Sequence, residues 1–286
     1  MLIKLRGCTS TRLRLAATAL IRVAAIGLLA FASAAEAETI GARYEVYTGG
    51  FKALSIQARA AIGDRTYDVE ANLKTTGAID WILRFTQKVE GRGRIETTAT
   101  PRLYISDGTF LGTPRLTRLD YRPDGGVDAR LDPPNNDDDD RTPVPEAMKA
   151  GTIDPITAFV ALNRAAVASG SPCSGKVPIF DGRRRFNLVL EEDGVTAVEP
   201  SQYTAFSGPA LRCKVHMERL AGFQRNPRFN ARPPGVSILY VARFGERETW
   251  LPVRLESDSG FGLVVGHLVE VDAPARPLGR GPRPAS

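Results

Sequence analysis

Apolar side chains recur at every second residue over much of this sequence, and that alternation limits the fold more than any other feature. It is clearest in 54–62 and 67–73, two runs that are separated by Gly63-Asp64. A strand with this pattern turns one face toward a core and the other toward water. Similar runs, with Gly, Asp or Pro between them, follow at 119–121, 127–131, 177–180, 186–190, 211–217, 236–244, 250–255 and 261–271. The sequence therefore predicts a mainly β protein, an antiparallel β-barrel or half-open barrel with one packed α-helix.

That helix is predicted where the two-residue pattern breaks. Asp154 suits the cap of a helix whose first residue is Pro155, and Gly170 suits its other end. Between these residues, apolar positions recur at helical spacing. A single helix among antiparallel strands cannot form parallel crossovers, so we expect it to pack on the sheet or to plug the opening. A shorter helical turn is predicted at Ile79–Leu83.

The N-terminus has the composition of a secretory signal peptide. Four basic residues precede position 15, an apolar stretch begins at Val23, and Ala35-Glu36-Ala37 has the small-x-small form of a cleavage site. Residues 1–37 are therefore expected to be removed after Ala37, which places the mature chain in the periplasm. The alternative, an uncleaved anchor, would carry Arg22 into the bilayer, and a charge in mid-span is costly.

The charge distribution argues against nucleic-acid binding. The chain carries a formal net charge of +6, but residues 1–37 hold five basic residues and one acid, which leaves the mature chain at +2. The tail, 273–286, holds three arginines and no acid, so residues 38–272 are close to neutral. A nucleic-acid interface needs a basic patch on the folded body. We expect no nucleic-acid partner, one β-rich domain over 38–272, and a disordered tail over 273–286.

Cys173 and Cys213 are the only cysteines of the predicted mature chain. In an oxidising compartment an isolated pair of this kind usually forms a disulfide, so the sequence predicts a Cys173–Cys213 bond. The alternative is a pair of buried free thiols.

Two internal segments, 132–151 and 221–235, lack periodicity and are predicted to be mobile loops. The first contains the run Asp137–Asp140, whose carboxylates are a possible calcium ligand set. The run lacks the spaced ligands and the glycine turn of a calcium loop, and consecutive like charges usually stay solvated. We therefore predict a solvated loop and no metal site.

The sequence shows no residue pattern of a catalytic or cofactor site. Residues 170–176 match seven positions of a phosphate-binding loop, but Val177 replaces the Ser or Thr that holds magnesium, and the segment follows a helix instead of a strand. His216 lies on the polar face of its strand. His267 is an even number of residues from apolar neighbours and so lies on the same face of its strand, and its ring is expected to point inward. Neither histidine has a nucleophile or a metal ligand at useful spacing, so we expect no enzyme activity and no cofactor.

Several short motifs, which are expected in turns and at strand edges, occur together in this sequence. They are Ala42–Tyr47 with Gly49-Gly50, Lys74–Gly77, Gly91–Gly93 before Pro101–Tyr104, Asp154–Ala158, Phe180–Arg184 and Trp250–Glu256. Over residues 41–272 the chain thereby resembles a bacterial envelope family, the domain of unknown function numbered 3108. The resemblance implies an exported, β-rich protein similar to the half-open barrels of lipoprotein carriers. That family has no assigned catalytic residues, so the resemblance transfers none.

Small residues in the inward-facing set predict unfilled space inside such a barrel. Ala58 and Ala60 share a strand face with larger apolar residues, and the helix is expected to reach that space through Phe159 and Leu162. We hypothesise a cavity for an acyl chain or another lipid-like envelope molecule, with these four residues and His267 as its candidate binding residues. The alternative is that the helix fills the space as ordinary core. A second function class also remains open, a structural or interaction module that contacts an envelope protein through its sheet edges and loops.

Overall fold

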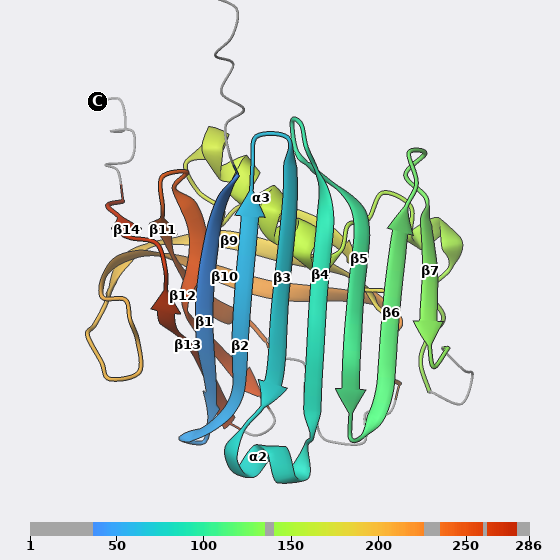
Figure 1. Cartoon of the computed structure of the whole chain (residues 1–286), viewed down its shortest axis with the longest axis horizontal. Coiled ribbons are helices and arrows are strands. Elements are labelled where there is room, and N and C mark those ends of the chain that lie inside the picture. The colour runs from blue at the N-terminus through green and yellow to red at the C-terminus, as the bar shows by residue number, and fades with distance from the viewer. Residues whose placement is uncertain (1–36, 135–139, 226–234, 260–261, 279–286) are drawn as a thin grey trace, which may run out of the picture. The chain divides into compact units, whose positions relative to one another are not determined.

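The computed structural model describes residues 37–134, 140–225, 235–259 and 262–278 (Figure 1). All of them belong to the second of two units into which the chain divides, Ala37–Ser286. The predicted signal peptide up to Glu36, the aspartates at 137–139 and residues 226–234 of the second predicted loop lie outside the described residues. The first strand begins at Glu38, the first residue of the predicted mature chain.

The described strands form one antiparallel sheet, in which two meanders are joined by the pairing of β1 with β13 (Figure 1). The order is β7-β6-β5-β4-β3-β2-β1-β13-β12-β11-β10-β9-β8, so the sheet ends at β7 and β8 and does not close. The bounds are β1 Glu38–Thr48, β2 Phe51–Ile62, β3 Thr66–Thr75, β4 Phe85–Ile95, β5 Ala99–Phe110, β6 Thr113–Tyr121, β7 Val127–Asp132, β8 Gly175–Phe180, β9 Arg185–Val198, β10 Gly208–Ala221, β11 Ser237–Phe244, β12 Thr249–Ser259 and β13 Gly262–Val271. The prediction of an antiparallel barrel or half-open barrel is confirmed, and of the two the structure has the half-open form.

The predicted helix is α3, Pro155–Ser169. The carboxylate of Asp154 caps it by accepting hydrogen bonds from the backbone N–H groups of Ile156 (2.9 Å) and Thr157 (2.8 Å). Asp154 is fully buried, and burial raises the pKa of its carboxyl against the lowering effect of these hydrogen bonds. At the other end Gly170 takes the left-handed conformation, with φ of 78°. The local signals in the sequence therefore place both ends of the helix correctly.

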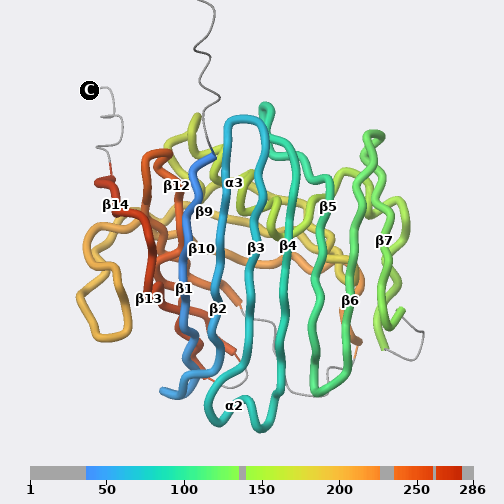
Figure 2. The backbone as a smooth tube through the Cα atoms, in the orientation of Figure 1, coloured from blue at the N-terminus to red at the C-terminus, as the bar shows by residue number. Residues whose placement is uncertain are grey.

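α3 packs against strands from both meanders of the sheet (Figures 1 and 2). Val160 lies in a core cluster with Val69 of β3, and Ala158 lies in another with Ile179 of β8. A helix that contacts both meanders occupies the space between them, so the expected packing of the helix on the sheet is observed.

The helix comes close to β4 because Gly91 has no side chain. A Cβ atom at Gly91 would collide with the side chain of Ile156. The hydroxyls of Tyr67 and Thr157, 2.5 Å apart, hold the same turn of the helix against β3. Gly91 therefore admits the helix, and the pairing of β4 with β5 shifts register close by, at Arg92/Gly93.

Shorter elements complete the unit, and one of them corrects the sequence analysis. The predicted helical turn is α2, Gly77–Ile82, and a 3₁₀ turn, η2, spans Glu146–Met148. The tail predicted to be disordered begins with an ordered strand, β14, Ala275–Arg276, which pairs with β11. The side chain of Arg276 also donates to the carbonyl of Gly245 (2.8 Å), which fixes this part of the tail in place. Within the described part of the chain, no helix is long and apolar enough to cross a membrane.

Candidate functional site

An apolar cavity of about 310 Å³ lies between α3 and the strands on both sides of the β1–β13 pair. Its lining comes from β1 (Ile40, Ala42, Tyr44, Val46), β2 (Ile56, Ala58, Ala60), β3 (Val69, Ala71), α3 (Ile156, Phe159), β11 (Leu239), β12 (Leu251, Pro252, Arg254, Leu255) and β13 (Gly266). Several of these apolar residues are only half-buried, among them Ala42, Val46 and Ala58. The cavity is therefore open to solvent on one side.

A row of alanines on three neighbouring strands forms the floor of the cavity. Ala42 of β1 is directly opposite Ala58 of β2, which in turn is directly opposite Ala71 of β3. Residues opposite one another in an antiparallel sheet share a face and lie close together. Three methyl groups in a row leave a depression that larger residues would fill, so the cavity follows from the small side chains at these register positions.

The helix covers the next row of the sheet and leaves the alanine row uncovered. That next row contains Ala60 and Val69, and Val160 of α3 packs on both of them. Ala60 is consequently buried, whereas Ala58 is half-buried. Phe159 lines the cavity and contacts the core clusters of both meanders. The helix therefore fills part of the interior and forms one wall of the remaining space.

The chemistry of the lining is almost entirely hydrocarbon. Burial raises the pKa of the Tyr44 hydroxyl, which keeps this group neutral at physiological pH. Arg254 is the one residue with a charged side chain among the described lining residues, and its guanidinium is 2.7 Å from the carboxylate of Glu256. With that charge compensated, the site suits an apolar chain and presents no acid, base or nucleophile arranged for catalysis.

Leu162 and His267 do not line the cavity, although the sequence analysis placed both residues there. Leu162 is half-buried elsewhere on α3. The alternation of inward and outward side chains in β13 reverses at a β-bulge. Consecutive residues of β1, Arg43 and Tyr44, pair with Glu270 and Leu268, so that Val269 has no partner in the register. The expectation that the His267 ring points into the cavity is therefore wrong.

His267 instead belongs to an aromatic cluster on the other face of the sheet. Its ring centroid is 6.0 Å from those of Tyr47 and Tyr203, and it is directly opposite Glu45 of β1. Burial and the positive charge of Arg254 lower the pKa of the imidazole. His267 is thus a buried ring beside Tyr203 and directly opposite Arg254, and it does not itself line the cavity.

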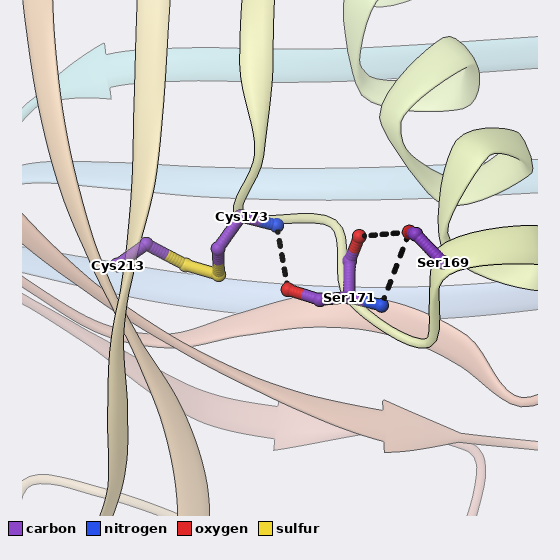
Figure 3. Close-up of a disulfide and its surroundings, with 4 residues drawn as sticks. All are labelled: Ser169, Ser171, Cys173 and Cys213. Carbon is purple, nitrogen blue, oxygen red and sulfur yellow. Dashed lines mark hydrogen bonds between the residues drawn. A yellow bond between two sulfur atoms is a disulfide. The ribbon is translucent and has the colours of Figure 1, made fainter. Parts of the chain in front are cut away.

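Cys173 and Cys213 lie at disulfide distance, with their Cα atoms 5.4 Å apart (Figure 3). Cys173 follows the end of α3, where its backbone N–H donates to the Ser171 hydroxyl (3.1 Å), and Cys213 belongs to β10. Both are fully buried in a cluster that includes Ala166 of the helix. A bond between them ties the end of the helix to the second meander.

The sequence contains two further segments with partial binding-site patterns, 170–176 and Asp137–Asp140. The segment 170–176 connects α3 to β8, the reverse of the strand-to-helix order of a phosphate-binding loop. No group of three or more potential metal ligands occurs within the described residues. Of the run Asp137–Asp140, only Asp140 is described.

A larger hollow of about 620 Å³ flanks the C-terminal half of α3 and is lined by charged as well as apolar residues. Arg247 is 2.6 Å from Asp64, and Arg243 is 2.6 Å from Glu248. Arg164 also lines the hollow and forms no ion pair with another described residue, so this space suits a polar or charged ligand better than an apolar chain. The smaller cavity is the better candidate site for an apolar chain.

The fold and the cavity define a class of protein, an open antiparallel β half-barrel with an internal helix and an apolar hollow beside it. The chain belongs to the family described as protein of unknown function (DUF3108), whose family model matches residues 43–269. Among solved structures it is similar to a β-barrel-like protein of the domain of unknown function DUF1849 from Brucella abortus. The identity is 11% and the TM-score 0.45, and the match covers 84% of this chain and 99% of the other. No curated protein matches the chain.

Proposed function

We propose that the protein is a periplasmic, non-catalytic binding protein that holds the acyl chain of an envelope lipid in the cavity between α3 and the alanine row. The observation that carries this proposal is the uncovered row Ala42–Ala58–Ala71 beside Phe159, since it leaves an apolar space where a closed core would have none. A volume of about 310 Å³ is at the lower end of the range for small-molecule sites. It suits a single chain better than a complete lipid.

Export is part of the same proposal, because an acyl-chain carrier in the periplasm would meet the lipids of the envelope membranes on both sides of that compartment. The signal-like segment 1–37 and the isolated pair of cysteines at disulfide distance are both typical of exported proteins. The head group of such a lipid would remain at the open side of the cavity, in water.

Titration with an environment-sensitive fluorescent fatty acid tests the proposal. The folded protein is expected to take up the probe saturably, near one probe per chain, and unlabelled fatty acid is expected to displace it. Burial of an apolar chain should give the binding a negative heat-capacity change, which calorimetry measures. Uptake that does not saturate, or that competitor leaves unchanged, would refute the acyl-chain site. The interaction-module function, acting through the edge strands β7 and β8, would then take its place.

A further inference from the structure

Large apolar side chains are exposed together at one end of the sheet. They come from the β1–β2 turn, α2, the β5–β6 turn, the start of β11 and the start of β13. We call this set the rim: Phe51, Trp81, Ile82, Leu111, Val236 and Leu263. Trp81 is 91% exposed and Ile82 is 77% exposed. Single exposed apolar residues are ordinary on soluble proteins, but a set gathered at one end marks an interaction surface.

The topology explains why these residues share one end. Alternate turns of an antiparallel meander lie at the same end, and Figure 2 shows the β1–β2 turn, α2 and the β5–β6 turn together at the lower edge. The second meander joins them there, because Thr48 at the end of β1 is directly opposite Val264 at the start of β13. Val46, which lines the cavity, is only two residues from Thr48. The rim therefore lies next to the cavity.

Hydrogen bonds hold the rim in place, so its exposure is a property of the fold. The N–H of Thr76, before α2, donates to the carbonyl of Ala53 in β2 (3.0 Å). The N–H of Leu111 donates to the carbonyl of Arg84, just after α2 (2.8 Å). The Thr75 hydroxyl donates to the carboxylate of Asp80 (2.5 Å). These bonds link three turns, and they keep α2 in a position where its apolar side chains face solvent.

Positive charges accompany the apolar side chains. Lys52 is next to Phe51, and Lys74 and Arg84 flank α2, with all three exposed. Lys52 is paired with Glu45 (2.8 Å), whereas neither Lys74 nor Arg84 forms a salt bridge with another described residue. The acid of α2, Asp80, accepts a hydrogen bond from the neutral Thr75 hydroxyl. Trp and aliphatic side chains with adjacent Lys and Arg are the combination that binds the interface of an anionic bilayer. Protruding side chains on separate turns also suit a deformable lipid surface, which needs no complementary pocket.

We propose that the rim docks on the surface of an anionic phospholipid bilayer, with Trp81 and Ile82 inserted among the head groups and Lys74 and Arg84 against the phosphates. The contact is peripheral, and it places the cavity next to the membrane. This inference goes beyond the acyl-chain site and does not depend on it, because a protein without an internal ligand could dock in the same way.

Tryptophan fluorescence tests the docking directly, because Trp81 is exposed whereas Trp250, the second of the chain's two tryptophans, is only 8% exposed. Mature protein recovered from periplasmic expression is titrated with vesicles of phosphatidylethanolamine and phosphatidylglycerol. We expect a blue shift of the emission and co-sedimentation with the vesicles, both weakened by salt and by vesicles of phosphatidylcholine alone.

Ile82→Ser keeps the Trp81 reporter and should weaken vesicle binding about tenfold, as the loss of one inserted side chain implies. The matched control is Val167→Ser, since Val167 is an exposed apolar residue (75%) on α3, away from the rim. This control should bind vesicles as the wild type does. Ile82→Ser should also take up the fatty-acid probe normally, so failure of docking and failure of the acyl-chain site are distinguishable.

An unchanged emission spectrum with anionic vesicles would overturn the proposal, as would equal binding by Ile82→Ser and the wild type. A photoreactive amino acid in place of Trp81 gives a further test in cells. Cross-links to lipid would support docking on the bilayer. Cross-links to protein alone, without vesicle binding, would assign the rim to a protein partner instead and overturn the proposal.

Discussion

Replacing Ala58 with phenylalanine is expected to weaken fatty-acid binding by at least about tenfold while the fold persists. Ala58 is in the middle of the alanine row, so an aromatic ring there would occupy the volume that we assign to the acyl chain. Its cross-strand neighbours, Ala42 and Ala71, are small enough to leave that ring room. Ala60 is a less suitable position, because it is buried beneath Val160 and a larger side chain would overpack the core, at a cost of about 1–3 kcal/mol.

The control for this variant is Ala197→Phe, which adds the same ring at an exposed position of β9, outside the cavity lining. Probe titration and urea denaturation are measured for all three proteins. We expect Ala58→Phe to lose probe binding, with a denaturation midpoint close to that of the wild type, and Ala197→Phe to retain both properties. If Ala58→Phe binds the probe with unchanged affinity, the chain is not held at the alanine row.

Breaking the bond predicted between Cys173 and Cys213 is expected to lower the free energy of unfolding by about 4 kcal/mol, from the chain-entropy model for a separation of 40 residues. The bond would close a loop that contains β8 and β9, and it would join the end of α3 to β10. Without it, packing and the two hydrogen bonds between the Asn163 side chain and the backbone of Trp250 (2.7 and 3.2 Å) would attach the helix to the second meander. The loss should therefore affect the wall of the cavity as well as global stability.

This stability difference is measured by urea denaturation of the oxidised protein and of the same protein unfolded, reduced and refolded in thiol. Comparing two redox forms of one sequence avoids the packing changes that a substitution would introduce in this buried cluster. Non-reducing peptide mapping gives the independent check. Two thiols that alkylate in native, unreduced protein would show that the cysteines are not bridged.

Local signals in the sequence predicted the elements of this fold well. Asp154, Pro155 and Gly170 located the helix because capping is a short-range effect that neighbouring residues determine. The strands follow from alternation, which reports the face that each residue occupies. The openness of the sheet had no such signal, because nothing in β7 or β8 indicates that the two strands fail to meet.

The site was predicted only in part, for reasons that concern longer-range geometry. Ala58, Ala60 and Phe159 do line the cavity. His267 does not, because the skipped residue Val269 reverses the parity of β13, and a bulge depends on the partner strand as much as on its own sequence. Leu162 does not line the cavity either. Helical spacing identifies the apolar face of a helix, but it does not determine how the helix is rotated on the sheet.

The rim shows a third limit of sequence reasoning. An apolar residue within a short helix is typical of core, and only the position of α2 at the end of two strands leaves Trp81 exposed. The same local sequence could pack inward on another scaffold. The exposed set becomes recognisable only when the turns of both meanders are brought to one end.

Native mass spectrometry of the protein purified from the periplasm shows whether the cavity holds a lipid. We expect the polypeptide mass of residues 38–286 together with an added mass that corresponds to a lipid or fatty acid. This added mass should be missing from Ala58→Phe and present in Ala197→Phe. A wild-type protein that carries no lipid as isolated, and that takes up none when fatty acid is added, would show that the cavity is not an acyl-chain site.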